Sequence, residues 1–144
     1  MEPHHLIPHA GRMCWLDGVE DHSPEVTRCT LTVRASTPLS GATSRIPAHA
    51  SLEYMAQTAA VHAALQARAA SPGGGLGRVA LLGTRVFELA RAWLEPGESL
   101  TAEAAPFAAS TAGLAVFDAN VRDAAGREVA RARLNLYAET TADG

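Results

Sequence analysis

One acidic side chain stands alone in the middle of the sequence. Between Glu25 and Glu88 the only acidic residue is Glu53, in the first turns of an alanine-rich segment that should form a largely buried helix. Burial disfavours the ionised form of a carboxylate, whereas the N-terminus of a helix favours it. A carboxylate balanced in this way can act as a general acid or base. A solvated residue that simply favours the helix start is an equally good interpretation of its position.

Two further polar side chains follow the helical spacing of Glu53. His49, Glu53 and Gln57 are four residues apart, so a helix would place them on one face. The same face carries Ala56, Ala60 and Ala64. Two potential proton carriers and an amide beside small residues would suit a slender ligand. The alternative is an exposed polar stripe, which is the preferred interpretation for His49 alone. We interpret His62, which lies among apolar residues, as structural.

The backbone at the start of this helix is a second candidate for chemistry. Unpaired N–H groups near Pro47 and Ala48 would attract negative charge and could polarise a thioester carbonyl. Every helix start has such groups, so this indication is generic.

Metal and nucleotide sites are not indicated. His4, His5 and His9 gather near the N-terminus, but their spacing matches no familiar metal site. The sequence contains no dinucleotide-binding glycine pattern, no phosphate loop and no Gly-x-Ser-x-Gly nucleophile elbow. The glycines at 73–75 are better explained as the end of a helix.

The elements that must position these residues are one helix and a set of strands. From Pro47 the next 23 residues contain no Gly or Pro and are rich in alanine, and SPGGG at 71–75 ends the helix. Strands are predicted at 13–22, 25–34, 78–90, 98–108, 112–122 and 127–139. One face of 25–34 carries Thr27, Cys29, Leu31 and Val33, and one face of 127–139 carries Ala130, Ala132, Leu134 and Leu136. Turns are predicted at 22–24 and 123–126, and a loop at 36–45.

A single long helix among strands joined by hairpins predicts an α+β fold, with the helix covering one face of an antiparallel sheet. The chain of 144 residues has the length of one domain, 1–144, with a frayed tail expected after about residue 139. Its hydrophobic content is 47%, yet much of this is alanine and only 5% of residues are aromatic. A core of small side chains is thin, which favours burial against a second subunit.

Charge and composition exclude several classes of protein. All twelve basic residues are Arg and they are scattered, so no nucleic-acid surface is expected. No apolar run approaches the roughly 20 residues of a membrane span, and the N-terminus lacks the layout of a signal peptide. Cys14 and Cys29 lie in apolar stretches, and buried free thiols are favoured over a disulfide. We therefore expect a cytoplasmic protein that binds neither nucleic acid nor membrane.

Several short segments together resemble a known family. IPH at 7–9, Met13 and WLD at 15–17 resemble the opening of hotdog-fold 3-hydroxyacyl-[acyl carrier protein] dehydratases. IPA at 46–48 and LEYMAQ at 52–57 resemble the start of their central helix. LLGTR at 81–85 and ARLNLY at 132–137 are similar to the ApeP-like branch, which is linked to aryl polyene biosynthesis. The resemblance extends from about residue 6 to residue 138.

The resemblance implies a hotdog fold, in which an antiparallel sheet wraps around one central helix, and dehydration of 3-hydroxyacyl thioesters. In the FabZ and FabA relatives a histidine and an acid share proton transfer across a dimer interface, and a backbone N–H holds the thioester carbonyl. The acid corresponds to Glu53 and the amide to Ala48, after Pro47. The histidine position corresponds to Leu39, so His9 and His49 are the candidates to replace it.

The resemblance also sets expectations for ligands and partners. The substrate would be a thioester of acyl carrier protein or of CoA, and no dissociable cofactor is needed because 4′-phosphopantetheine arrives with the substrate. Gln57 and Arg85 are further candidates for substrate binding; Arg45 and Arg78 could also meet a phosphate or an acidic carrier protein. The assembly would be a homodimer, or a heterodimer with another hotdog subunit. The alternatives are a partner subunit with little or no activity of its own, and a hotdog acyl thioesterase.

Overall fold

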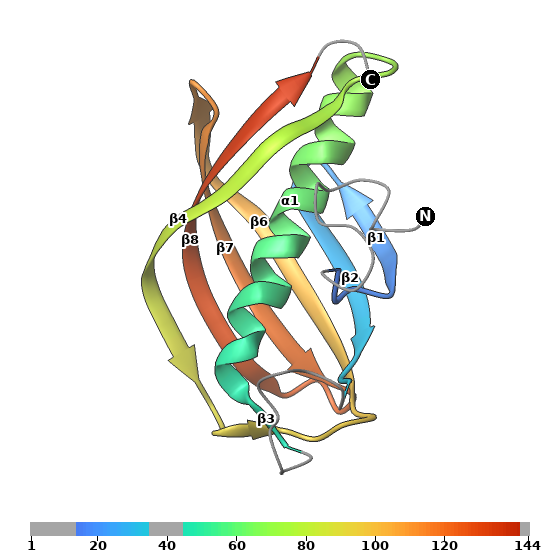
Figure 1. Ribbon diagram of the computed structural model, residues 1–144, viewed down its shortest axis with the longest axis vertical. Coiled ribbons are helices and arrows are strands. Elements are labelled where there is room, and N and C mark those ends of the chain that lie inside the picture. The colour runs from blue at the N-terminus through green and yellow to red at the C-terminus, as the bar shows by residue number, and fades with distance from the viewer. Residues whose placement is uncertain (1–13, 35–44, 142–144) are drawn as a thin grey trace.

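One long helix lies in the hollow of a twisted antiparallel sheet (Figure 1). The computed structural model describes residues 14–34 and 45–141. In chain order the elements are β1 (Gly18–Ser23), β2 (Val26–Thr32), β3 (Ile46–Pro47), a 3-10 turn (Ala48–Ala50), α1 (Ser51–Ala70), β4 (Gly75–Leu89), β5 (Trp93–Leu94), β6 (Ser99–Thr111), β7 (Leu114–Asp123) and β8 (Glu128–Thr141). This is the α+β hotdog arrangement expected from the sequence, and the predicted fold class is confirmed.

The main sheet has six strands in the order β1-β2-β6-β7-β8-β4, and every neighbouring pair is antiparallel. The strand that follows the helix, β4, therefore lies at one edge of the sheet, beside the last strand of the chain. Its pairing with β8 shifts register three times along its length. Such bulges bend a strand and increase its twist, and in Figure 1 β4 curves around the helix.

The alternation read from the sequence decides which side chains reach the core. In β2 the side chains of Thr27, Cys29 and Leu31 are buried, as is Val33 just beyond the strand. The inward residues of β8 are also buried as predicted: Ala130, Ala132, Leu134, Leu136. Many of the inward positions of the sheet are alanines, which lets the helix pack close to it. Both cysteines are buried thiols outside any disulfide, so the expectation of buried thiols is confirmed.

The helix starts later than the sequence suggested. Residues 48–50 form a 3-10 turn, and the α-helix begins at Ser51. Pro47 belongs to a two-residue strand that pairs with β5. These two short strands were not predicted, because two residues leave no periodicity to detect. The helix ends at Ala70, directly before the SPGGG segment that was expected to end it. At the other end of the chain β8 continues to Thr141, two residues past the predicted strand.

The remaining predicted boundaries differ by a few residues. The first strand begins at Gly18 rather than at residue 13, and β4 begins three residues earlier than predicted. The hairpin turn at 123–126 is present, with Gly126 at a positive φ of 83° that a residue without a side chain adopts easily. The predicted loop at 36–45 lies almost entirely outside the described residues.

Candidate active site

A small cavity lies between the helix and the edge of the sheet. It has a volume of about 110 Å³ and is enclosed by one face of α1, by β4 and by β8. Its lining residues are Glu53, Ala56, Gln57, Ala60, Val79, Leu81 and Leu136. Among these described residues the helix supplies the polar side chains, and the strands supply an apolar wall. Glu53 is the one ionisable side chain among these lining residues.

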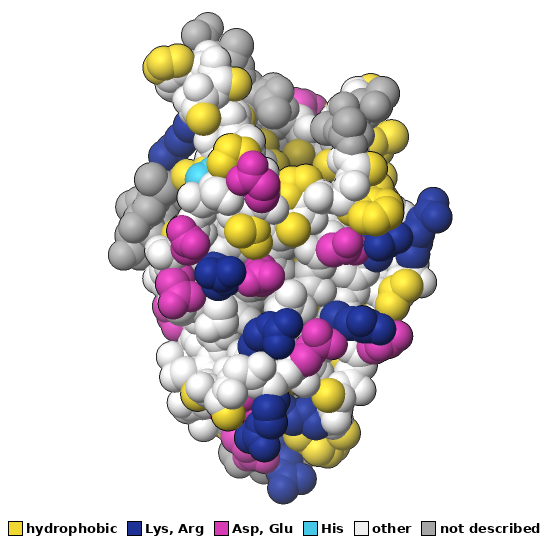
Figure 2. Space-filling view, turned by 180° about the vertical axis from the view of Figure 1, so that it is seen from behind, with side chains coloured by type: hydrophobic (Ala, Val, Ile, Leu, Met, Phe, Trp, Pro, Cys, Tyr) yellow, Lys and Arg dark blue, Asp and Glu magenta, His cyan; other side chains and the backbone are white. Residues whose placement is uncertain are grey.

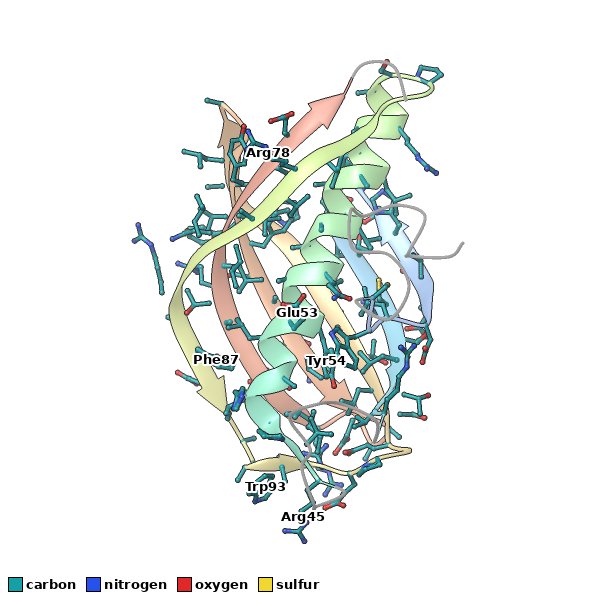
Figure 3. The ribbon with its side chains drawn as sticks, in the orientation of Figure 1. Arg45, Glu53, Tyr54, Arg78, Phe87 and Trp93 are labelled. Atoms are coloured by element: carbon teal, nitrogen blue, oxygen red, sulfur yellow. The ribbon has the colours of Figure 1, made fainter. Side chains whose placement is uncertain are left out.

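The helical spacing explains how Glu53 and Gln57 meet. Residues four apart stand one above the other on a helix, and Gln57 Nε2 donates a hydrogen bond of 3.0 Å to Glu53 Oε1. Ala56 and Ala60 complete the same face, as the sequence predicted, and both are buried. Glu53 itself is half-buried. Tyr54, its neighbour in the chain, leaves the helix toward the β2 side instead (Figure 3).

Gln57 has a second partner that the sequence did not reveal. The backbone N–H of Trp15 donates a hydrogen bond of 2.9 Å to Gln57 Oε1. Trp15 belongs to the WLD segment that precedes β1, so a stretch far away in the chain fixes the orientation of the amide. Residue types alone do not predict a contact that a backbone N–H makes. The family resemblance of the WLD motif was the only indication that this segment has a functional role.

His49 is not brought to Glu53. It lies in the 3-10 turn before α1, its side chain is exposed, and between these two described residues there is no hydrogen bond or ion pair. The four-residue spacing that would align them requires continuous α-helix, which begins only at Ser51. His9, the other histidine candidate, lies outside the described residues, as does position 39.

The backbone amide of Ala48 is already occupied. Its N–H donates a 2.9 Å hydrogen bond to the carbonyl oxygen of Ala92, next to the short β3–β5 pairing. An N–H that is already hydrogen-bonded to a carbonyl oxygen is not available to bind a thioester carbonyl. This geometry therefore does not support the role expected for Ala48. Pro47 has no N–H to offer. Its part is to hold the entry to the helix through β3.

The comparisons with known proteins identify the family of this chain. The ApeP-like family, described as ApeP dehydratase, matches residues 1–143. The chain belongs to the ApeP-like dehydratase family. The resemblance stated from the sequence motifs is thereby confirmed. The cavity of this ApeP-like chain is lined in part by the acidic residue Glu53. Among curated protein sequences, none matches the chain.

Solved structures show how widely this fold is shared. The dehydratase heterocomplex ApeI:P from Xenorhabdus doucetiae matches with a TM-score of 0.84 and 21% identity, over 96% of this chain and 91% of the other. The Escherichia coli PaaI protein matches with a TM-score of 0.62 and 16% identity, over 83% and 77%. A Haemophilus influenzae thioesterase matches with a TM-score of 0.55 and 16% identity, over 86% and 77%. At these identities the likeness concerns the fold alone.

The arginines considered for substrate binding lie away from the cavity lining. Arg85 is exposed on β4 of this ApeP-like chain and is not among the residues that enclose the cavity. Arg78 forms a 3.6 Å ion pair with Glu139, and Arg45 a 3.4 Å pair with Glu95. Exposed pairs of this kind contribute little to stability. The substrate-binding role of Arg85 remains a prediction.

The edge strand beside the cavity exposes large apolar side chains. Leu81, Leu82, Val86 and Leu89 on β4 are each between 37% and 58% exposed. The cavity wall is part of this strand, because Leu81 contributes to both. A long edge strand with open hydrogen-bonding groups and apolar side chains is a ready surface for a second chain.

The outer face of the sheet differs sharply from this edge. Seen from behind, arginine and acidic side chains alternate over its middle (Figure 2). Arg131 bonds Glu88 at 2.9 Å and Arg133 bonds Asp118 at 2.9 Å. A shallow hollow of about 420 Å³ lies among these pairs. Its charges are matched to one another, so it lacks the convergent polar groups of a reactive site.

Two general absences apply to the described part of the chain, residues 14–34 and 45–141. No three His, Cys, Asp or Glu side chains there come together in a way that could hold a metal ion. No helix there has both the length and the apolar character needed to cross a membrane.

Proposed function

We propose that the protein dehydrates 3-hydroxyacyl thioesters borne on the 4′-phosphopantetheine arm of an acyl carrier protein, in a pathway that builds a polyene chain. The observation that carries this proposal is the placement of Glu53, beside Gln57, in a mostly apolar cavity of a chain of the ApeP-like dehydratase family. No dissociable cofactor takes part in the reaction as proposed.

The reaction requires two proton movements. A base removes a proton from Cα of the acyl chain, the Cβ–O bond breaks, and an acid gives a proton to the departing hydroxyl, which leaves as water. The electron pair from the C–H bond forms the new double bond. Glu53 serves one of these two roles. General acid–base catalysis by one well-placed group contributes about 10²- to 10⁴-fold to the rate.

The lining of the cavity fits this substrate in outline. Ala56 and Ala60 leave room beside the helix, while Val79, Leu81 and Leu136 form an apolar wall for an acyl chain. Ligand sites are commonly mostly apolar with a few placed polar groups. Glu53 and Gln57 supply those polar groups at one side of the cavity.

The second proton-transferring group is proposed to come from a partner hotdog subunit. Among the described residues that line the cavity, Glu53 is the one ionisable side chain, and the exposed β4 edge adjoins the cavity wall. The similar ApeI:P structure is named as a dehydratase heterocomplex. Pairing along β4 would bring a side chain of the second subunit to the open side of the cavity.

The test is to assay the chain alone and together with the hotdog subunit that co-purifies from the native host. A 3-hydroxyacyl carrier protein is incubated with each preparation, and loss of water is followed by mass spectrometry. Dehydration that requires this chain, and within it Glu53, supports the proposal, whether the chain acts alone or in the complex. Release of a free thiol without dehydration would instead support a thioesterase.

The second candidate is a partner subunit that only stabilises a complete dehydratase. It is favoured by the exposed position of His49, which leaves Glu53 without a histidine from the described part of its own chain. Under this candidate the complex is active, but replacing Glu53 leaves its rate unchanged. That outcome separates it from the catalytic role proposed above.

A further inference from the structure

Gln57 is almost fully enclosed, with 1% of its surface exposed. Two of the partners of its side-chain amide differ in kind. On one side the Trp15 N–H donates to Oε1 at 2.9 Å, and on the other side Nε2 donates to Glu53 Oε1 at 3.0 Å. A buried amide that meets both a donor and an acceptor is satisfied in only one orientation.

The Trp15 N–H determines that orientation. An amide side chain presents two ends of similar shape, and rotation by 180° exchanges its oxygen and nitrogen. A backbone N–H can only donate, so the end facing Trp15 must be the oxygen Oε1. The end facing Glu53 is therefore always the NH₂ group, a donor. Reversing the amide would set two donors against each other at Trp15.

This arrangement constrains the proton of the carboxylate. Glu53 Oε1 accepts the hydrogen bond from Gln57, and in a protonated carboxyl group the carbonyl oxygen is a better acceptor than the hydroxyl oxygen. The favoured position for the proton of a protonated Glu53 is therefore Oε2. We propose that Gln57 is a positioning residue for dehydration, which directs the exchangeable proton of Glu53 to Oε2 and is itself held by the backbone of Trp15.

The inference rests on the proposed function and sharpens it. It replaces the expected role of Gln57 in substrate binding by a role exerted through Glu53. A carboxylate with one favoured proton-bearing oxygen needs no rotation before each transfer, which is the advantage of a preorganised catalytic group. It also assigns a purpose to the backbone of Trp15, a residue that is not among the described residues of the cavity lining.

Two substitutions of Gln57 separate positioning from packing. Gln57→Leu keeps the approximate size but removes both hydrogen bonds. Gln57→Glu still accepts from Trp15, yet it can donate to Glu53 only when the two carboxyl groups share a proton, which neighbouring carboxylates do as the pH falls. The matched control is Gln66→Leu, on the same helix and half-buried but outside the cavity lining.

The measurements are kcat and KM of the complete dehydratase complex across pH. Loss of a hydrogen bond to a charged group predicts a fall in kcat of about 10- to 100-fold for Gln57→Leu, with KM little changed. Gln57→Glu should recover activity toward low pH, whereas Gln57→Leu should not, and Gln66→Leu should behave as wild type. A rise in KM with unchanged kcat, or the same pH profile for both Gln57 variants, would overturn the positioning role.

A readout that needs no catalysis keeps this inference distinct from the proposed function. Gln57 Nε2 carries the two protons of a side-chain amide, which are visible by NMR. The resonance of the proton that Gln57 donates to the Glu53 carboxylate should differ between the wild-type protein and Glu53→Ala, because the variant lacks this acceptor. If wild type fails to dehydrate any thioester but this difference is seen, the proposed function fails and the positioning by Gln57 stands. Identical resonances in the wild-type protein and in Glu53→Ala would overturn the positioning alone.

Discussion

The hydroxyl of Thr27 lies 2.8 Å from Nδ1 of His62, inside the core between the helix and β2. The same hydroxyl lies 2.7 Å from Nδ1 of His22. One hydroxyl has a single proton, so when it donates to one imidazole it must accept from the other. The rings of His62 and Phe117 also meet edge to face, with centroids 5.7 Å apart. His62 is therefore a structural histidine, as the sequence suggested.

The pH dependence of stability should report on this buried ring. Burial, with a smaller contribution from the nearby charge of His22, lowers the pKa of His62 from 6.5 to about 4. Between these two pKa values the unfolded chain therefore binds more protons than the folded protein. The stability that neutral His62 contributes is complete above about pH 6.5 and is lost as the pH falls toward 4. At about 1.4 kcal/mol for each pKa unit, the loss reaches up to about 3 kcal/mol.

Chemical denaturation at a series of pH values between 7 and 4.5 measures this loss. His62→Phe removes the titrating ring, so the free energy of unfolding should fall less steeply toward low pH than in wild type. His49→Phe is the matched control, because its ring is exposed. If the free energy of unfolding falls equally steeply with pH in the wild-type protein and in His62→Phe, His62 does not cause the loss of stability at low pH.

The thiol of Cys29 should be unreactive in the folded protein. Burial is the main cause that raises the pKa of Cys29 to about 12, and the side chain is fully enclosed. Alkylation requires an accessible thiolate. Mass spectrometry after treatment with iodoacetamide should find Cys29 unmodified under native conditions and modified after unfolding. Rapid labelling of the native protein would contradict the packing of β2 against the helix.

The exposed β4 edge should be needed for assembly. Leu82 is 58% exposed on this strand, and Leu82→Asp would place a charge in the proposed contact with a second subunit. Leu114→Asp is a fair control, because Leu114 is 49% exposed but belongs to β7, inside the sheet order. Sedimentation velocity should show dissociation for Leu82→Asp alone. If both variants assemble as wild type does, the partner binds elsewhere.

The cavity volume should limit the acyl chain. Ala60→Val adds two methyl groups to a residue that lines the cavity, while Ala63→Val makes the same change outside the lining. Such small steric differences in an apolar pocket change kcat/KM by about 10-fold or more, and the cost to the helix stays below about 1 kcal/mol. Steady-state kinetics should show the loss for Ala60→Val only. A loss of equal size in both variants would indicate damage to the helix instead.

The fold could be predicted because its signals are local and periodic. The alternation around Cys29 and Leu134 fixed the inward faces of β2 and β8, and the alanine-rich stretch up to SPGGG fixed the one long helix. The start of that helix was placed too early. Pro47 is compatible with a helix start, but its pairing with Trp93 in β3–β5 is a contact distant in sequence that no local pattern records.

The candidate site was predictable only where the helix supplies it. Glu53 and Gln57 share a face because of their spacing, and this part of the prediction agrees with the structure. His49 lies in the 3-10 turn before the helix, so it is not aligned with Glu53 as expected. The Ala48 N–H is hydrogen-bonded to the Ala92 carbonyl oxygen, so it is not available for the expected role. Trp15 contacts Gln57 through its backbone N–H, so the type of the Trp15 side chain could not predict this contact.

The most direct test of the proposed mechanism is the rate of dehydration by the complex that carries Glu53→Gln in this chain. Glutamine keeps the shape of the side chain and cannot transfer a proton as a carboxylate does. With a 3-hydroxyacyl carrier protein as substrate, the mechanism predicts dehydration by the wild-type complex and a loss of about 100-fold or more in the variant, with assembly intact. Dehydration at the wild-type rate by the Glu53→Gln complex would contradict the catalytic role of Glu53.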